Sequence, residues 1–261
     1  MKNIINDFKI YKNYIFYSTK SKLKSEVSNS YLNALWWLLN PLIYMLIYIF
    51  IVEIVFKRNE INFPVFVFIG LTIWNYCSRF LNSSVKTIID NKTILNKTYL
   101  PKYILLIIKS FTLIFQMIIS IILVFILMSI FKIHLTITSF LFPLILIVMY
   151  LFTFGIGLIF MHIGVYISDF KNIIELLLKF IFYFSGIFYS VEKALPNILS
   201  KLILYCNPFA FFIDSSRKVL MYNKIPNLYV LAIYLFSSIV IVLIGLKIVS
   251  KNENKYVKVI I

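Results

Sequence analysis

The side chains with the greatest capacity for chemistry are two histidines and two cysteines in a chain of 261 residues. His134 and His162 have no second histidine or carboxylate at metal-ligand spacing, and Cys77 and Cys206 share no short spacing. We therefore predict no metal site and no disulfide framework. For His162, which lies in an apolar run, we weigh a functional role against a hydrogen bond to a neighbouring helix. We favour the bond, because buried polar groups generally find partners.

Nucleotide chemistry has no motif in this sequence. The pattern GxxxxGK[ST] does not occur, and none of the six glycines is placed to cradle a phosphate. A chain without that loop is not expected to hydrolyse ATP. We predict no catalytic residue and no metal or cofactor bound by this chain.

Aromatic residues are in excess, with 26 Phe and 18 Tyr. Most of them are expected to face lipid or to form interfacial belts. A tyrosine ring also stacks on a sugar face while its hydroxyl bonds to sugar hydroxyls, so a tyrosine-rich pore would suit a glycan. Tyr44 and Tyr48 lie one helical turn apart and share a face. The sequence leaves open whether that face meets a pore or a partner helix.

The composition defines the protein class. Hydrophobic residues make up 61% of the chain and the mean hydropathy is +0.92, more than a soluble core of this length buries. The net charge of +16 would suggest nucleic acid in a soluble protein, but the basic residues lie in short connections between apolar runs. We therefore expect an integral membrane protein whose charges set its orientation and attract anionic lipid headgroups, with no nucleic-acid partner.

Six apolar runs are long enough to cross a hydrocarbon core, which needs about 20 residues. They are residues 35–56, 63–81, 103–130, 140–166, 173–189 and 228–249. Trp36 and Trp37 mark the entry into the membrane, because indole rings favour its boundary. Glu175 and Lys179, one turn apart in the fifth run, are expected to pair. The sequence predicts an all-α integral membrane protein with six transmembrane helices.

Three of the segments outside these spans have an apolar pattern of their own. Residues 1–30 carry Ile4, Phe8, Tyr11 and Ile15 at helical spacing among lysines, which favours an amphipathic interface helix over a disordered basic tail. Residues 82–102 have a helical apolar pattern that suits a short helix at the membrane surface. Residues 190–227 contain two apolar pieces that are short and charged, opened by Pro196 and by Asn207-Pro208. These pieces indicate two re-entrant or interfacial helices before the last span.

The positive-inside rule gives an orientation. With the N-terminus in the cytoplasm, the four inner segments hold fourteen Lys and Arg residues and the three outer segments hold eight. We therefore predict that both termini are cytoplasmic. The first apolar run has no small-residue cleavage site behind it, so we expect the first span to remain in the protein.

The chain resembles the permease subunits of ABC exporters for O-antigen, capsule and teichoic-acid polysaccharides. Five stretches in the family's order carry the resemblance: SYLNALWWLLNPLIYM (30–45), FIGLTIWNY (68–76), ILNKTYLPKYIL (94–105), YISDFKNI (166–173) and YCNPFAFFID (205–214). Together they extend over nearly the whole chain. The resemblance implies a six-helix permease in the cytoplasmic membrane of a bacterium, which pairs as a homodimer.

The resemblance also implies partners and parts. Two copies of a cytoplasmic ABC ATPase would hold ATP and Mg and drive export of a lipid-linked polysaccharide. Residues 1–30 would form the interface helix and residues 31–261 the permease domain, with 82–102 as coupling segment and 190–227 as external gate. The candidate residues are Trp36, Trp37, Tyr44 and Tyr48 for the substrate path; Lys20, Lys22 and Lys24 for the lipid-carrier headgroup; Lys86, Asp90, Lys92, Lys97 and Pro101 for ATPase coupling; and Pro196, Asn207 and Pro208 for the gate.

Several alternatives stay open. The three lysines of the interface helix could simply be solvated and lipid-facing. The same six-span plan suits an ABC exporter permease for drugs or lipids. A membrane enzyme such as a glycan acyltransferase would need an interfacial acid or base, for which only His162, Asp169 and Glu175 are present.

Overall fold

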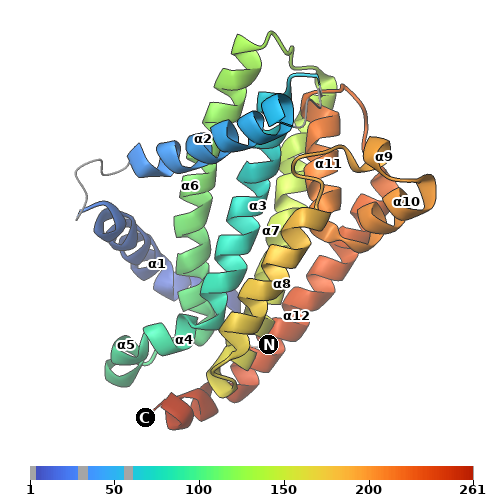
Figure 1. Cartoon of the computed structure of the whole chain (residues 1–261). Helices are drawn as coiled ribbons and strands as arrows, with labels where there is room; N and C mark the ends of the chain where they lie inside the picture. Colours follow the sequence, from blue (N-terminus) through green and yellow to red (C-terminus); the bar gives the residue numbers. More distant parts are fainter. Residues whose placement is uncertain (1–3, 29–34, 56–60, 261) are drawn as a thin grey trace.

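The computed structural model describes residues 4–28, 35–55 and 61–260, and every regular element in these ranges is a helix (Figure 1). The boundary predicted between residues 30 and 31, and the predicted end of the first span at Phe56, lie outside the described residues. The helices are α1 (Ile4–Val27), α2 (Trp36–Ile49) continued by a π-helix (Phe50–Val55), α3 (Phe63–Val85), α4 (Thr87–Asp90), α5 (Lys92–Lys97), α6 (Lys102–Ile130), a 3-10 turn (Ile137–Leu141), α7 (Phe142–Tyr166), α8 (Phe170–Phe184), α9 (Val191–Ala194), α10 (Asn197–Cys206), α11 (Pro208–Leu220) and α12 (Leu228–Ile260).

The membrane class is confirmed by the lengths of the helices. Within the described residues, five helical segments are long and apolar enough to cross a membrane: 36–53, 63–85, 102–130, 137–166 and 228–256. The bent pair α10 and α11, whose axes meet at 102°, brings the number to six if it counts as one span. This bent pair lies directly before the last span, as predicted.

Helix α3 is the centre of the bundle. It packs against α6, α7, α8 and α11, and 78% of its apolar window is buried, whereas only 11% of the window of α2 is buried. Helices α7 and α12 approach closely at two glycines. A Cβ atom on Gly155 would lie 2.9 Å from the backbone N of Val242, and one on Gly245 would lie 2.7 Å from Leu158. Small residues of this kind let helix backbones pack in lipid.

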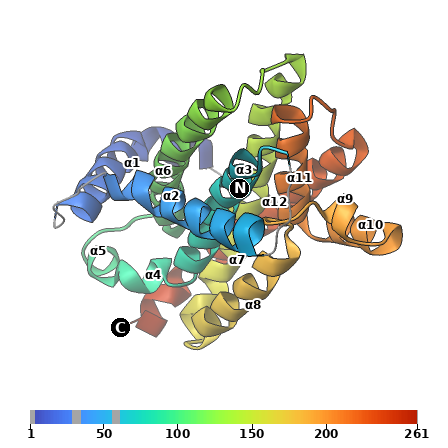
Figure 2. The same cartoon turned by 45° about the horizontal axis from the view of Figure 1, so that its top comes forward.

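Two ends of the bundle are distinct (Figures 1 and 2). The short helices α4 and α5 and the end of α12 gather at one end, whereas α9 to α11 and the connection from α6 to α7 lie at the other. Helix α1 packs along α6 with Ile15 buried, while Phe8 and Phe16 are exposed. Residues 4–27 thus form a helix and not a disordered tail.

Helix α2 differs from the predicted first span in its direction. Both views show it crossing α3 and α6 steeply instead of running beside them (Figures 1 and 2). Its length and composition suit a span, but few of its side chains are buried in the chain itself. Most of the apolar surface of α2 is therefore left uncovered by the chain itself and is available to lipid or to another protein.

The fifth predicted span is shorter than expected. Helix α8 has 15 residues and ends at Phe184, and Gly186 then takes a φ of 65°, which turns the chain away from the helix axis. Fifteen residues make a helix of about 22 Å, less than the hydrocarbon thickness of about 30 Å. The predicted pair of Glu175 with Lys179 is also wrong, because Glu175 pairs with Lys171 at 3.6 Å.

The interpretation of His162 is confirmed. Its Nδ1 atom lies 2.8 Å from the Tyr256 hydroxyl, in a hydrogen bond between α7 and α12. This bond fastens the last turns of α12 to the bundle.

Candidate functional site

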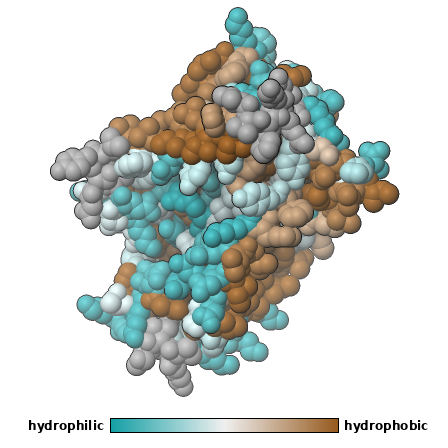
Figure 3. All heavy atoms as spheres, in the orientation of Figure 1, coloured by the Kyte–Doolittle hydropathy of each residue, from teal (hydrophilic) through white to brown (hydrophobic). Residues whose placement is uncertain are grey.

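A hollow opens between α2, α3, α6 and α8. It consists of two adjoining parts of about 480 and 560 Å³, which share Tyr44 and Asn75. We call it the polar groove. Its polar and aromatic lining comprises Trp36, Trp37, Asn40, Tyr44, Tyr48, Thr72, Trp74, Asn75, Tyr76, Ser78, Arg79, Asn82, Gln116, Ser120, Glu175, Lys179, Phe182 and Tyr183. Figure 3 shows hydrophilic side chains gathered below α2, where the surface is hollowed.

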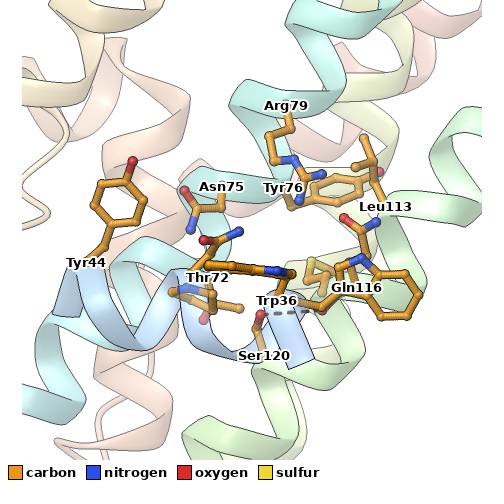
Figure 4. Close-up of a pocket in the computed structure, with 13 residues that line it drawn as sticks. Trp36, Tyr44, Thr72, Asn75, Tyr76, Arg79, Leu113, Gln116 and Ser120 are labelled. Carbon is orange, nitrogen blue, oxygen red and sulfur yellow. Dashed lines mark hydrogen bonds between the residues drawn. The ribbon is translucent and has the colours of Figure 1, made fainter. Parts of the chain in front are cut away.

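One face of α3 supplies the polar floor of the groove. Thr72, Asn75, Arg79 and Asn82 recur at helical spacing, so they line one face of the helix. Figure 4 shows Thr72, Asn75 and Arg79 of α3 near Gln116 and Ser120 of α6, with Tyr44 of α2 at the opposite rim. Polar side chains inside a membrane segment are costly and therefore mark functional faces. This spacing is visible in the sequence as a polar face of the second predicted span.

Two amide oxygens in the groove have no hydrogen-bond partner among the described residues. They are Gln116 Oε1 and Asn82 Oδ1, both buried from solvent. The other end of the Gln116 amide is fixed, since its Nε2 donates to Glu26 Oε2 of α1 at 2.6 Å. A buried acceptor without a partner is unfavourable unless water or a ligand supplies the donor. The hydrogen-bond donors for these two oxygens would therefore have to come from water or from a ligand.

The four aromatic residues predicted for the substrate path all line the groove. Tyr44 borders both parts and is 53% exposed. Tyr48 is held more tightly, because its ring stacks on Phe188 with the centroids 3.8 Å apart. Trp36 and Trp37 line the part next to α6. That a substrate passes these rings stays a prediction.

The three lysines predicted for the headgroup lie differently. Lys20 and Lys24 are exposed, whereas Lys22 is half-buried against α6. Burial lowers the pKa of the Lys22 ammonium, and the nearby charge of Lys109 lowers it further. Lys109 in turn has Arg79 as a charged neighbour.

We call Lys22, Arg79 and Lys109 the basic cluster. Within the described residues, none of these three side chains forms a hydrogen bond or an ion pair, although the carboxylates of Glu26 and Asp90 lie near enough to interact electrostatically. Arg79 and Lys109 were not predicted, because each is a lone charge within an apolar run. An isolated charge within an apolar run was the signal that could have found them.

The predicted coupling residues lie at the end of the bundle that carries α4 and α5. Lys97 and Asp90 are exposed, Lys86 and Lys92 are partly exposed, and Pro101 is buried at the start of α6. That start is fastened to α12, because the Lys102 N–H donates to Glu253 Oε1 at 3.2 Å and the Tyr99 hydroxyl donates to Glu253 Oε2 at 3.1 Å.

A second bond joins the same region to α1. The Tyr103 hydroxyl donates to Asp7 Oδ2 at 2.6 Å. The negative charge of Glu253 also raises the pKa of Tyr99. Asp7, Tyr99 and Glu253 were not predicted, since bonds between residues so far apart in sequence leave no local pattern.

The predicted gate residues shape the bend between α10 and α11. Asn207 caps α11, with its Oδ1 accepting from the backbone N–H groups of Phe209 at 3.1 Å and Ala210 at 3.3 Å. Its Nδ2 donates to Ser185 Oγ at 3.2 Å, which ties the bend to the end of α8. Pro208 is the first residue of α11, and Pro196 directly precedes α10. These residues set the geometry of the bend, while their role in gating stays a prediction.

Arg217 of α11 anchors this region to α3. It is 3% exposed and donates to three backbone carbonyls, those of Phe66 at 3.0 Å, Gly186 at 2.6 Å and Ile187 at 2.7 Å. Its guanidinium also lies 3.4 Å from the centroid of the Phe66 ring.

The described residues contain no group of three or more His, Cys, Asp or Glu side chains that could hold a metal ion.

Comparisons with known proteins agree with this geometry. The family model described as ABC-2 type transporter matches residues 14–221. The chain is 24% identical over 227 residues, 87% of each chain, to the O-antigen export system permease protein RfbA of Myxococcus xanthus. It is 29% identical over 244 residues and 28% identical over 246 residues, 93% of each chain in both cases, to two proteins of that name from Klebsiella pneumoniae. The chain therefore belongs to the ABC-2 type transporter family, as a multi-pass membrane permease subunit.

Proposed function

We propose that this permease exports a lipid-linked polysaccharide, of the O-antigen, capsular or teichoic-acid type, across the cytoplasmic membrane of a bacterium. Two copies of a separate ABC ATPase, which bind ATP and Mg, would drive the export. The observation that carries this proposal is the polar groove, with its unpartnered amide oxygens on Asn82 and Gln116 and its aromatic rim. The names of the relatives support the same class of cargo.

The groove suits a sugar chain that must slide. Sugar hydroxyls donate to amide oxygens, and sugar faces stack on tyrosine and tryptophan rings. Conduction requires contacts that are favourable enough to admit the substrate and weak enough to release it. An exporter of apolar drugs would be served by an apolar hollow, so the amide and charged lining favours the polysaccharide. A membrane enzyme is disfavoured because His162 bonds to Tyr256 and Glu175 pairs with Lys171.

A homodimer would complete the path. The groove opens at the side of one chain, and the apolar surface of α2 next to it is largely exposed. A two-fold pair buries the same patch on both copies and would close two open grooves into one channel. We propose this arrangement with both termini in the cytoplasm, which places α4 and α5 beside the ATPases.

The basic cluster suits the phosphate groups of the lipid carrier. Lys22 is the member of the predicted lysine trio that turns inward, and Arg79 and Lys109 add two further charges. Cations without protein partners are ready to form charge-assisted hydrogen bonds to phosphate oxygens. The headgroup would thus bind at the groove, while the exposed Lys20 and Lys24 attract anionic lipid.

The coupling segment would pass movement from the ATPases to the bundle. Helices α4 and α5 protrude from the bundle, and the Glu253 and Asp7 bonds link the start of α6 to α12 and α1. A push on α4 and α5 would therefore move three helices together.

The test measures the export of surface polymer by a bacterial strain from which the chromosomal gene of the permease has been deleted. The permease and its own ATPase are then supplied to this strain together. We expect wild-type permease to restore surface polymer and the double variant Asn82→Leu/Gln116→Leu to reduce it at least about tenfold, because two hydrogen-bonding groups are lost. Asn172→Leu, an exposed amide outside the groove, is the matched control and should export normally. Normal export by the double variant, with co-purification of the ATPase unchanged, would overturn the role of the groove.

A further inference from the structure

A second polar hollow of about 290 Å³ lies between α9, α10 and α11 and shares no residue with the polar groove. We call it the gate pocket, and its main polar residues are Glu192, Asn197, Tyr205, Asp214, Ser215 and Lys218. Its volume is at the lower limit for small-molecule sites, which are about 300–1,000 Å³. A site of this size holds one small ring and not a length of polymer.

Two carboxylates of the gate pocket are held in place by one lysine. Lys218 Nζ lies 2.7 Å from Asp214 Oδ2 and 2.7 Å from Glu192 Oε1. The second oxygen of each carboxylate has no hydrogen bond within the described ranges. The lysine therefore fixes two acceptors and leaves each with capacity for a hydroxyl donor. Because Lys201 also lines the hollow, the formal charges balance and a neutral ligand is favoured.

Ser215 points to a ligand independently of these charges. Its side chain is 1% exposed, lines the gate pocket, and has no hydrogen-bond partner among the described residues. Helical serines usually bond to a carbonyl one turn back, as Ser216 does to the Phe212 carbonyl at 2.8 Å. Ser215 makes no such bond, so its hydroxyl is left for whatever fills the pocket.

An aromatic ring completes the lining. The Tyr205 side chain is 48% exposed. Its backbone carbonyl is fixed by the Tyr234 hydroxyl at 2.9 Å, so the position of α10 at this residue is set by α12. An exposed ring on a fixed backbone offers a face for stacking.

We propose that the gate pocket binds a single sugar unit of a glycan. Sugar hydroxyls would donate to Asp214 and Glu192 and bond with Ser215, while the sugar face stacks on Tyr205. This inference rests on the proposed function, because the exported polymer is the source of the sugar. It adds a second contact for the polymer, at the end of the bundle opposite α4 and α5.

The experiment uses saturation-transfer NMR to measure the binding of glycosides to the permease–ATPase complex in lipid nanodiscs. The probes are the methyl glycosides of the sugars released from the host's surface polymer by acid hydrolysis. We expect Ser215→Ala to weaken binding about fivefold, the value of one neutral hydrogen bond. Tyr205→Ala should weaken it about tenfold, while Tyr205→Phe retains it. Tyr229→Ala, which is 86% exposed and outside the gate pocket, is the matched control and should bind normally.

Several outcomes would overturn the proposal. Undiminished binding by Ser215→Ala would do so, because that residue belongs to the gate pocket alone, and so would no binding of any glycoside. Displacement of the glycoside by pyrophosphate would also count against a neutral sugar site. If one of these outcomes is found while polymer export is normal, only the sugar site is overturned and the proposed function remains supported. Failure of the wild-type permease to restore surface polymer would overturn the proposed function itself.

Discussion

Two arginines next to α3 have opposite surroundings. Arg217 approaches α3 from α11, is 3% exposed, and donates to three carbonyls while lying over Phe66. Arg79 belongs to α3 itself, faces the polar groove, and has no hydrogen bond or ion pair within the described residues. A guanidinium whose donors are used by the backbone holds a structure together. One whose donors are unused is ready for a ligand.

The same contrast separates the two sides of α3. On the side of Arg217, the donors of that buried guanidinium are paired with the carbonyls of Phe66, Gly186 and Ile187. On the side of the groove, Asn82 and Gln116 keep unpartnered oxygens. Substitutions on the first side should therefore change stability, and those on the second side should change transport.

The largest effect is expected for Arg217→Ala. It removes three charge-assisted hydrogen bonds and leaves the Gly186 and Ile187 carbonyls without their donor. We expect the free energy of unfolding to fall by at least about 3 kcal/mol. Denaturant unfolding of the detergent-solubilised protein measures this, and Arg217→Lys, which keeps the charge, should lose less. A loss below about 1 kcal/mol would show that Arg217 is not a structural anchor.

Gly70→Ala should have an intermediate effect. Its new Cβ atom would lie 2.6 Å from Arg217 Nη2, so the arginine must shift from its carbonyl partners. We expect a loss of about 1–2 kcal/mol in the free energy of unfolding. The control is a double-mutant cycle with Arg217→Ala. In the Arg217→Ala background, most of the loss in the free energy of unfolding caused by Gly70→Ala should disappear. Additive losses would mean that the glycine matters for another reason.

Arg79→Gln should have the smallest effect on stability and a clear effect on transport. We expect the free energy of unfolding to stay within about 0.5 kcal/mol, since no hydrogen bond or ion pair within the described residues is lost. Surface polymer should fall about tenfold, because the proposed charge-assisted bond to the lipid-carrier phosphate is lost. Lys12→Gln, an exposed charge on α1, is the control and should export normally. Normal export by Arg79→Gln would remove the contrast between the two arginines.

Hydropathy predicted the long helices well. The second span was expected to start at Phe63 and the third to cover 103–130, and the structure has Phe63–Val85 and Lys102–Ile130. Polar turns and prolines mark those limits clearly. The last span was expected to end at Val249, but its helix α12 continues to Ile260. The polar residues after Ser250 end the hydropathy signal without ending the helix, and Tyr256 is buried against α7.

The structural features that were not predicted from the sequence depend on long-range contacts. Apolarity continues through Ile187 and Phe188, so hydropathy could not show that the backbone turns at Gly186 and shortens α8. Arg217 was recognised only as a charge that interrupts an apolar piece, because its partner Phe66 lies 151 positions away. For the groove, the sequence predicted its aromatic rim, whereas the basic cluster needed α1, α3 and α6 to be placed side by side.

Helix α12 connects the two ends of the molecule as a single rod. Its 33 residues make a helix of about 50 Å. At one end Glu253 binds the start of α6, and at the other Leu228 follows Asn227, which lines the gate pocket. Considered as a lever, a rod of this length converts a tilt of about 5° into a displacement of about 4 Å at its far end. A small movement where α4 and α5 lie is thus geometrically sufficient to change the width of the pocket that we propose holds one sugar.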